Sequence, residues 1–192
     1  ADILNSIYPN INLTENLIIT SIAKSKLFEK EIWLGTERNG IYRIDCTNSK
    51  FEKFCSSCTL SNQINTNNIS TLYEHKNALW IGTLNGLKRF NPVAETFESF
   101  SLSNGLPGNV LCGLVIDNSG KLWISTTNGI GRFDYKNKTS AVFTYDDGLQ
   151  SNEFKARSIQ KDKDGYLYFG GVNGFNVINA ENLFVKKLKN IK

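Results

Sequence analysis

A two-part motif recurs four times along the chain, and it constrains the fold more than any other feature of the sequence. Its first part is an aromatic residue followed a few positions later by an Asn-Gly pair, at a period of about 45 residues. The copies are Trp33 with Asn39-Gly40, Trp80 with Asn85-Gly86, Trp123 with Asn128-Gly129 and Tyr168 with Asn173-Gly174. Its second part is a loop: residues 104–110 (NGLPGNV) match 147–153 (DGLQSNE) and, more weakly, 62–68 (NQINTNN). A period of this length with several short strands per copy is typical of a β-propeller.

Each copy divides into four short strands separated by turns. In the third copy we expect strands over 110–117, 121–126, 130–135 and 140–145. The same division predicts blades at about 17–58, 68–101, 110–145 and 154–187, between an N-terminal segment (1–16) and a basic tail (188–192). No run of helical periodicity competes with this pattern. The sequence therefore predicts an all-β fold of four four-stranded antiparallel blades.

The repeated residues are expected to be architectural. Neighbouring blades pack face to face, so the aromatic residue can fill the wedge between them, and a glycine beside it lets another backbone approach. The Asn-Gly turn matches the right-handed twist of a hairpin, and the threonines after the tryptophans suit a pleated strand. The structural repeat residues are Trp33, Gly35, Gly40, Trp80, Gly82, Gly86, Trp123, Gly129, Tyr168, Gly170 and Gly174.

Composition excludes several classes of function. The net charge of +4 is carried by four lysines within the last seven residues, so nothing predicts a nucleic-acid surface. No stretch approaches the 18 consecutive apolar residues of a membrane span. The chain contains no Met and begins ADILNS, which leads us to expect an excised piece of a longer protein.

The four cysteines are not arranged as a metal site. Cys55 and Cys58 form a C-x-x-C, but no second pair stands at zinc-finger spacing, and the only histidine, His75, is expected in a turn. The default expectation for all four, with Cys46 and Cys112, is an unpaired, half-buried thiol. A short-loop disulfide between Cys55 and Cys58 is the alternative, and the cysteines do not decide the compartment.

The sequence predicts no catalytic residue, metal or cofactor. A Ser-His-Asp triad lacks a suitably placed histidine, and no G-x-S-x-G is present. Asp117 and Asp164 repeat at the turn between the first two strands of a blade, where we expect them to cap the turn rather than to act as paired carboxylates. Residues 161–165 (KDKDG) resemble a calcium loop, but they carry two lysines and lack the acids that should follow.

Residues that break the repeat are the candidates for ligand binding. Arg38 lies in a lengthened first turn, and Glu153, Lys155 and Arg157 replace the apolar pattern where the fourth blade begins, beside the expected central channel. Such charges could hold a sugar acid or a sulfate, contact further blades, or pair with each other. The asparagines that end the cross-blade loops are expected to bond local backbone instead: Asn67, Asn109 and Asn152.

Together these motifs resemble a known family. The stretch 79–92 (LWIGTLNGLKRFNP), the loop GLP-x-N and the turn D-x-x-G-x-LW resemble the two-component regulator propeller repeats of Bacteroidetes hybrid two-component systems. The resemblance covers residues 17–187. The first copy departs from it by its longer turn TERNG and a degraded GLP-x-N, and the fourth by Tyr168 in place of Trp.

The resemblance implies a periplasmic sensor region that responds to oligosaccharides and dimerises. The histidine kinase and DNA-binding parts of such proteins lie outside this chain. Four blades are fewer than the seven that the family implies, so the chain could be a segment of a larger propeller, pair with a second copy, or close on itself, with residues 1–16 as a closing strand. A structural or protein-interaction propeller without a small ligand is the alternative function, and a propeller enzyme such as a lyase is a third.

Overall fold

The structure, a computed structural model, describes residues 17–48, 50–58, 63–181 and the backbone of 184–188. The expected closing strand (1–16) and most of the basic tail lie outside these residues. Within them the regular structure is β-strand, apart from two 3₁₀ turns at Leu102–Asn104 and Tyr145–Asp147. No helix in this part of the chain is long and apolar enough to cross a membrane.

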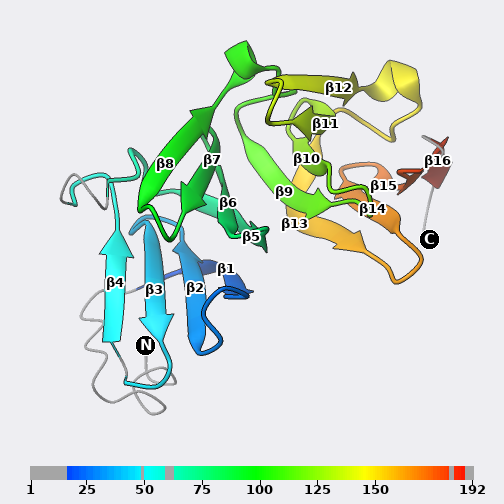
Figure 1. Cartoon of the computed structure of the whole chain (residues 1–192). Coiled ribbons are helices and arrows are strands. Elements are labelled where there is room, and N and C mark those ends of the chain that lie inside the picture. The colour runs from blue at the N-terminus through cyan, green and yellow to red at the C-terminus, as the bar shows by residue number, and fades with distance from the viewer. Residues whose placement is uncertain (1–16, 49, 59–62, 182–183, 189–192) are drawn as a thin grey trace. The chain divides into compact units, whose positions relative to one another are not determined.

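The strands form four antiparallel sheets of four, each built from strands consecutive in sequence (Figure 1). The first contains β1 (Ile19–Lys24), β2 (Glu31–Thr36), β3 (Ile41–Asp45) and β4 (Lys50–Phe54). The second contains β5 (Ile69–His75), β6 (Ala78–Thr83), β7 (Gly86–Asn91) and β8 (Thr96–Phe100). The third contains β9 (Leu111–Ile116), β10 (Leu122–Thr126), β11 (Gly129–Asp134) and β12 (Thr139–Phe143). The fourth contains β13 (Phe154–Lys161), β14 (Tyr166–Gly171), β15 (Gly174–Asn179) and β16 (Phe184–Leu188). The predicted all-β fold of four propeller blades is confirmed.

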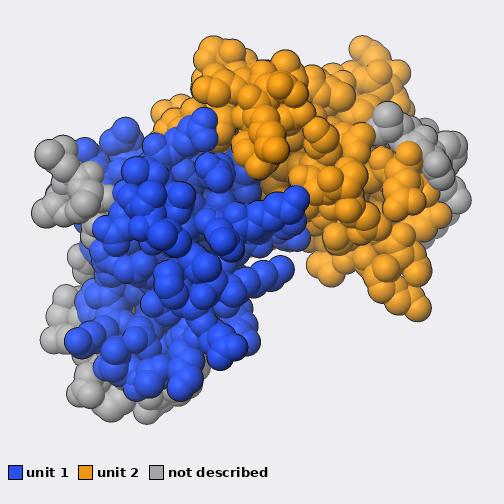
Figure 2. All heavy atoms as spheres, in the orientation of Figure 1, with its two compact units in different colours: residues 1–81, 89–98 blue, residues 82–88, 99–192 orange. Residues whose placement is uncertain are grey.

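The chain divides into two compact units, coloured separately in Figure 2. The first comprises residues 1–81 and 89–98, and the second comprises 82–88 and 99–192. The second sheet contributes residues to both, so each unit is described by itself below.

An aromatic residue lies at the centre of each unit's core. Trp33 is fully buried, and its ring lies 6.0 Å from that of Phe54 in its own sheet and 5.7 Å from that of Phe90 in the next. Trp123 is equally buried, stacks on Phe143 at 5.7 Å and lies 6.3 Å from Phe169 in the next sheet. Each of these tryptophans therefore fills the space toward the following sheet.

The glycine near the first tryptophan makes room for a side chain, whereas we expected it to make room for a backbone. A Cβ added to Gly35 would lie 2.7 Å from Cγ2 of Ile69 in β5, so a side chain of the following sheet, not its backbone, occupies this space. Gly113 in β9 meets Ile159 of β13 at the same distance. Adjacent sheets thus interlock by a branched side chain over a glycine, which lies in β2 in the first unit and in β9 in the second.

The two parts of the sequence motif are joined by one hydrogen bond, which occurs three times. The glycine N–H of each Asn-Gly turn donates to the carbonyl of the asparagine that ends the following cross-blade loop. The pairs are Gly40 to Asn67 (3.0 Å), Gly86 to Asn109 (2.7 Å) and Gly129 to Asn152 (2.7 Å). The apolar residue inside each loop is buried: Ile64, Leu106 and Leu149 are at most 4% exposed. Each loop is therefore held at both its backbone and its side chain.

The threonine that ends the second strand closes the same turn. Thr83 Oγ1 donates to the Gly86 carbonyl at 2.7 Å and accepts the Asn85 N–H at 3.0 Å. Thr36 and Thr126 make the equivalent pairs of bonds. The threonine is thus a turn cap in addition to a strand former.

In the third and fourth sheets an acid in the preceding turn binds the polar group of the aromatic residue. Asp117 accepts the indole N–H of Trp123 at 2.8 Å, the Lys121 N–H at 2.9 Å and the guanidinium of Arg132 at 3.0 Å. In the fourth sheet Asp162 takes this place and accepts the Tyr168 hydroxyl at 2.9 Å. The equivalent of Asp117 is therefore Asp162, and the predicted match to Asp164 is wrong because the acid must stand six residues before the ring that it binds.

The cysteines are not all free thiols. Cys55 and Cys58 form a disulfide, so the default expectation is wrong for this pair, while Cys46 and Cys112 are free. The pairing follows from a tight turn after β4 in which the Cys58 N–H donates to the Cys55 carbonyl. His75 is the last residue of β5, one position earlier than the turn in which it was expected.

Replacing Gly129 with Ala should strongly destabilise the protein. Its φ of +108° disfavours any side chain, and an added Cβ would lie 2.5 Å from the Phe143 carbonyl oxygen. We expect a loss of about 3 kcal/mol in the free energy of unfolding, measured by urea denaturation. Gly148→Ala is the matched control, because Gly148 has a φ of +95° with nothing within 4 Å and should cost only about 1 kcal/mol. Equal losses in the two variants would contradict the proposed crowding at the turn.

Replacing Asp117 with Asn should remove stability in a pH-dependent way. Burial alone would raise the pKa of Asp117, but hydrogen bonds from Ser119, Trp123 and Lys121 and the charge of Arg132 hold it below its usual range. A depressed folded-state pKa contributes stability above the unfolded value of about 3.9, and this contribution is lost as the pH falls through the folded pKa. We expect Asp117→Asn to cost about 3 kcal/mol at pH 7 and markedly less below pH 3. A cost that does not change with pH would show that the charge of Asp117 is not what stabilises the fold.

Candidate functional site

The loop that leads into the fourth sheet is held by buried amides. Asn176 is fully buried in β15, and its Oδ1 accepts the Gln150 N–H at 3.0 Å. Gln150, 1% exposed, accepts the Asn173 N–H at 2.6 Å with its side-chain oxygen. Its side-chain nitrogen also lies 3.4 Å from the Glu153 carbonyl. The chain therefore enters β13 from a rigid platform.

Gln150 takes over the role of the missing threonine in this blade. In the other three sheets a threonine hydroxyl accepts the N–H of the turn asparagine, whereas Gly171 stands at that position here. A side chain on Gly171 would collide with the Gln150 amide. The Gly170-Gly171 pair and Gln150 together thus replace the turn threonine. In the sequence this replacement is visible as GLQ at 148–150, where the preceding loop has GLP at 105–107.

Phe154, the first residue of β13, is anchored by both its side chain and its backbone carbonyl. Phe154 is 2% exposed and packs edge-on against Phe169 at 6.3 Å. Its carbonyl accepts the Cys112 thiol at 3.2 Å. Burial, followed by the nearby charge of Glu153, raises the pKa of the Cys112 thiol to about 11, so it remains a donor at neutral pH.

Directly after Phe154 the strand leaves the sheet. Phe154 pairs with Gly171 and Ile159 with Phe169, so residues 155–158 stand opposite the single residue Gly170. The innermost strand β9 carries only a one-residue irregularity at the equivalent place. All four bulged residues are exposed. Arg157 has a φ of +64°, a backbone conformation that costs free energy for a residue other than glycine. Enlarged bulges and strained residues of this kind are typical of functional sites.

Three of the four predicted ligand-binding residues lie on this segment, Lys155 and Arg157 within the bulge and Glu153 just before it. Lys155 Nζ lies 2.7 Å from a Glu153 carboxylate oxygen, and both side chains are about half exposed. Arg157 follows on the same segment and makes no hydrogen bond or ion pair to the described residues. Arg38 belongs to the other unit, is 78% exposed and lies 3.8 Å from Glu37, so the structure does not group it with the rest.

Two cationic side chains and one carboxylate lie at the bulge and just before it. Lys155 is partly neutralised by Glu153, while the Arg157 guanidinium presents free donors in the fork geometry that suits a carboxylate or sulfate. No group of three metal-ligating side chains is found within the described part of the chain. The supporting residues Gln150, Asn176 and Cys112 were not predicted, because their roles depend on contacts between segments far apart in sequence.

The cross-blade asparagines behave as expected at two of three places. Asn67 Oδ1 accepts the Ser56 N–H at 2.8 Å, and Asn152 Oδ1 accepts the Tyr145 N–H at 2.6 Å. Asn109 Oδ1 is buried without a hydrogen-bond partner in the described structure, so the expectation is wrong there. Its backbone carbonyl still accepts the Gly86 N–H.

Replacing Arg157 with Gly should stabilise the fold. Glycine adopts a φ of +64° without steric cost, so the change should add up to about 1 kcal/mol to the free energy of unfolding. Ala156→Gly, in the same bulge but without a positive φ, is the control and should cost about 0.5 kcal/mol. Chemical denaturation of the two variants measures both. A destabilised Arg157→Gly variant would mean that Arg157 supports the fold rather than a ligand.

Comparison with known proteins relates the chain to bacterial extracellular domains. No protein-family model matches the sequence, and no curated protein does. Among solved structures, the extracellular domain of the putative hybrid two-component system BT3049 from B. thetaiotaomicron is 26% identical, with a TM-score of 0.74 over 91% of this chain and 23% of that one. That of BT4673 is 21% identical, with a TM-score of 0.72 over 90% and 24%. An auxiliary nutrient binding protein from the same organism shares the fold at 13% identity, with a TM-score of 0.65 over 88% and 40%.

The matches cover only part of the similar proteins. This chain spans about a quarter of the length of each two-component domain that it matches. Only the first match exceeds 25% identity, so the other two support the fold alone. The resemblance predicted from the LWIGT and GLP-x-N motifs is confirmed: the chain is a set of β-propeller blades similar to the extracellular domains of Bacteroides hybrid two-component systems.

Proposed function

We propose that the chain is a ligand-binding segment of a periplasmic sensor and that the bulge of β13 binds an acidic oligosaccharide. The observation that carries this proposal is Arg157, an exposed arginine kept in a strained conformation without a partner among the described residues. Backbone strain at a charged surface residue, with no contact of its side chain to compensate for it, favours a role in binding. A uronic acid or a sulfated sugar offers the planar or tetrahedral oxyanion that a guanidinium recognises. The segment is not an enzyme in this proposal, and the kinase belongs to the parent protein.

The similar proteins support a sensing role. The match above 25% identity is the extracellular domain of a putative hybrid two-component system. The Cys55–Cys58 disulfide favours an oxidising compartment, which agrees with a periplasmic location. A propeller lyase has less support, because His75 ends a strand of the first unit, Asp162 caps a turn and Glu153 is paired with Lys155.

Thermal unfolding in the presence of sugars tests the proposal. Oligogalacturonates and chondroitin sulfate oligosaccharides should raise the Tm of the chain, while neutral xylo-oligosaccharides should not. A ligand at a hundred times its Kd stabilises the native state by about 2.7 kcal/mol, which is readily measured. Arg157→Gln should abolish the shift and Lys155→Gln should reduce it.

Lys163→Gln is the matched control for this experiment. Lys163 is equally exposed, but it lies in the turn at the other end of β13. The Lys163→Gln change removes the same charge as Lys155→Gln and should leave the Tm shift unchanged. A shift with neutral sugars that survives Arg157→Gln would move the ligand site elsewhere, and no shift with any sugar would favour an interaction propeller.

A specific observation also favours a protein-interaction role. Trp33, Trp80 and Trp123 are at most 2% exposed, whereas Tyr168 at the same position is only half-buried and its neighbour Tyr166 is 40% exposed. The face of the fourth sheet that would meet a following sheet is therefore uncovered among the described residues. Further blades of a parent chain or a second copy of this one could cover it.

A further inference from the structure

The three cross-blade loops described above begin in the same way. Each starts directly after the outer strand of its sheet, and the carbonyl of its first residue accepts the N–H of the buried apolar residue inside the loop. The pairs are Ile64 to Cys55 (3.4 Å), Leu106 to Ser101 (3.3 Å) and Leu149 to Thr144 (3.3 Å). Cys55, Ser101 and Thr144 therefore hold equivalent places in the three loops.

In the second and third loops this first residue is bonded to the residue three positions later. The Asn104 N–H donates to the Ser101 carbonyl at 2.9 Å, and the Ser101 hydroxyl lies 3.4 Å from Asn104 Oδ1. The Asp147 N–H donates to the Thr144 carbonyl at 3.1 Å, and the Thr144 hydroxyl lies 3.1 Å from Asp147 Oδ2. Each turn is thus closed by a hydrogen bond between two side chains, in addition to its backbone bond.

The first loop closes the same turn with a disulfide. The Cys58 N–H donates to the Cys55 carbonyl at 3.3 Å, as in the other two turns, and the Cys55–Cys58 bond takes the place of the hydrogen bond between side chains. A disulfide across so short a loop restricts the unfolded chain less than one that joins distant segments. Because hydrogen bonds suffice at both equivalent turns, the blade fold does not by itself require a covalent bond here.

The two sulfurs of this disulfide differ in their access to solvent. Cys55 is only 5% exposed, whereas Cys58 is half-buried. The Cys55 sulfur lies 3.5 Å from the Ser57 hydroxyl oxygen, so this hydroxyl can donate to a Cys55 thiolate. An external thiolate therefore reaches Cys58 more readily, and Cys55 is the better placed leaving group.

The disulfide turn is bonded to the far end of its loop. The Ser56 N–H donates to Asn67 Oδ1 at 2.8 Å, and the Ser56 carbonyl accepts the Gln63 side-chain amide at 3.0 Å. The Asn67 carbonyl in turn accepts the Gly40 N–H of the Asn-Gly turn. Thiols are weak hydrogen-bond partners, so a reduced pair of cysteines cannot rebuild the side-chain bond of the other two loops. Reduction would thus loosen this series of bonds at its first link.

We propose that Cys55–Cys58 is an exchangeable disulfide, which closes the first cross-blade loop when oxidised and releases it when an external dithiol of the thiol–disulfide oxidoreductase class reduces it. A thiolate of the dithiol bonds to Cys58 Sγ as the disulfide breaks, and Cys55 leaves as a thiolate and takes up a proton. The second thiol of the dithiol loses its proton, attacks the mixed disulfide and releases Cys58. Two electrons and two protons pass to the cysteines, and the dithiol becomes a disulfide. This device does not depend on the ligand proposed above.

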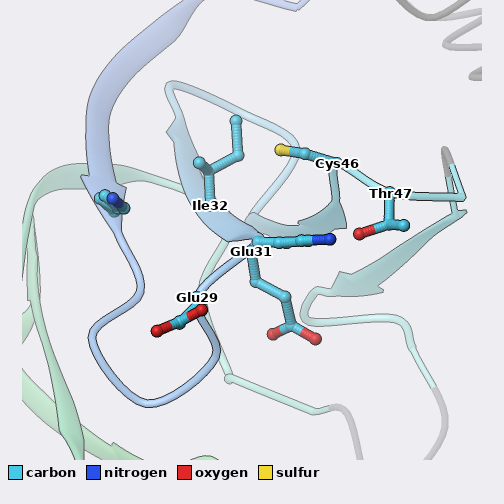
Figure 3. A pocket seen from close by; sticks show the side chains of 7 residues that line it. Glu29, Glu31, Ile32, Cys46 and Thr47 are labelled. Atoms are coloured by element: carbon cyan, nitrogen blue, oxygen red, sulfur yellow. The ribbon is translucent and has the colours of Figure 1, made fainter.

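Cys46 has to be removed before the disulfide can be tested. It is a free, half-buried thiol that lines a surface hollow of the first sheet, with its sulfur turned toward Ile32 (Figure 3). It would react with the same reagents as Cys58. The remaining free thiol of a Cys46→Ser chain is Cys112, which is buried.

Amide hydrogen exchange of this Cys46→Ser chain tests the proposal. Dithiothreitol, without denaturant, should reduce the disulfide while the chain stays folded. Exchange at the Gly40 and Ile64 amides should then accelerate by about tenfold or more, because both donate to carbonyls of the released loop. The equivalent amides of Gly86 and Leu106 are internal controls and should not change.

Two double variants separate the covalent bond from the closed turn. Cys55→Ser with Cys58→Asn gives the first loop the side chains of the second, so it should keep the Gly40 and Ile64 amides protected and be insensitive to dithiothreitol. Cys55→Ala with Cys58→Ala removes both kinds of bond and should exchange as the reduced chain does. Protection that is equal in the two variants would contradict the role assigned to this turn.

The remaining outcomes distinguish an exchangeable bond from a fixed one. Glutathione, with immediate alkylation of the freed thiol, should form its mixed disulfide on Cys58, and an adduct on Cys55 would overturn the direction of attack. Reduction only in denaturant, or unchanged amide exchange after complete reduction, would overturn the proposal. The disulfide would then be a fixed staple for a longer loop, since five residues separate Cys58 from Ile64 and one separates Asn104 from Leu106.

Discussion

The hydrogen bond from each turn glycine to the carbonyl of the following loop asparagine is the contact on which the blades depend. It joins the two conspicuous parts of the sequence motif, and it explains why they recur together. The glycine is required twice over at Gly129, by its positive φ and by the Phe143 carbonyl against its Cα. With the turn closed by Thr126 and the loop plugged by Leu149, one blade delivers the chain to the start of the next.

The fourth blade keeps this plan while changing its parts, and its functional features follow from those changes. Gln150 replaces the turn threonine, which requires glycine at position 171. Asn176 secures the loop, so β13 can leave the sheet at Lys155 without loosening the blade. The strained Arg157 is then carried by a rigid base, and a base of this kind lets a binding residue be held in position before its ligand arrives.

Within each unit, neighbouring sheets are joined by the same two kinds of contact. A tryptophan fills the space toward the next sheet, Trp33 in the first unit and Trp123 in the second. A branched side chain of the next sheet lies over a glycine, Ile69 over Gly35 and Ile159 over Gly113.

The sequence by itself determined the blade fold, because a motif that pairs a wedge-filling aromatic residue with an Asn-Gly turn allows few alternatives. It also singled out Glu153, Lys155 and Arg157, since charges that interrupt an apolar repeat are visible without a structure. It offered the Cys55–Cys58 bond only as an alternative, and it could not equate Asp162 with Asp117 or find Gln150 and Asn176. The disulfide and the Asp162–Tyr168 contact depend on the exact geometry of local turns, whereas Gln150 and Asn176 meet only because segments 26 residues apart pack together.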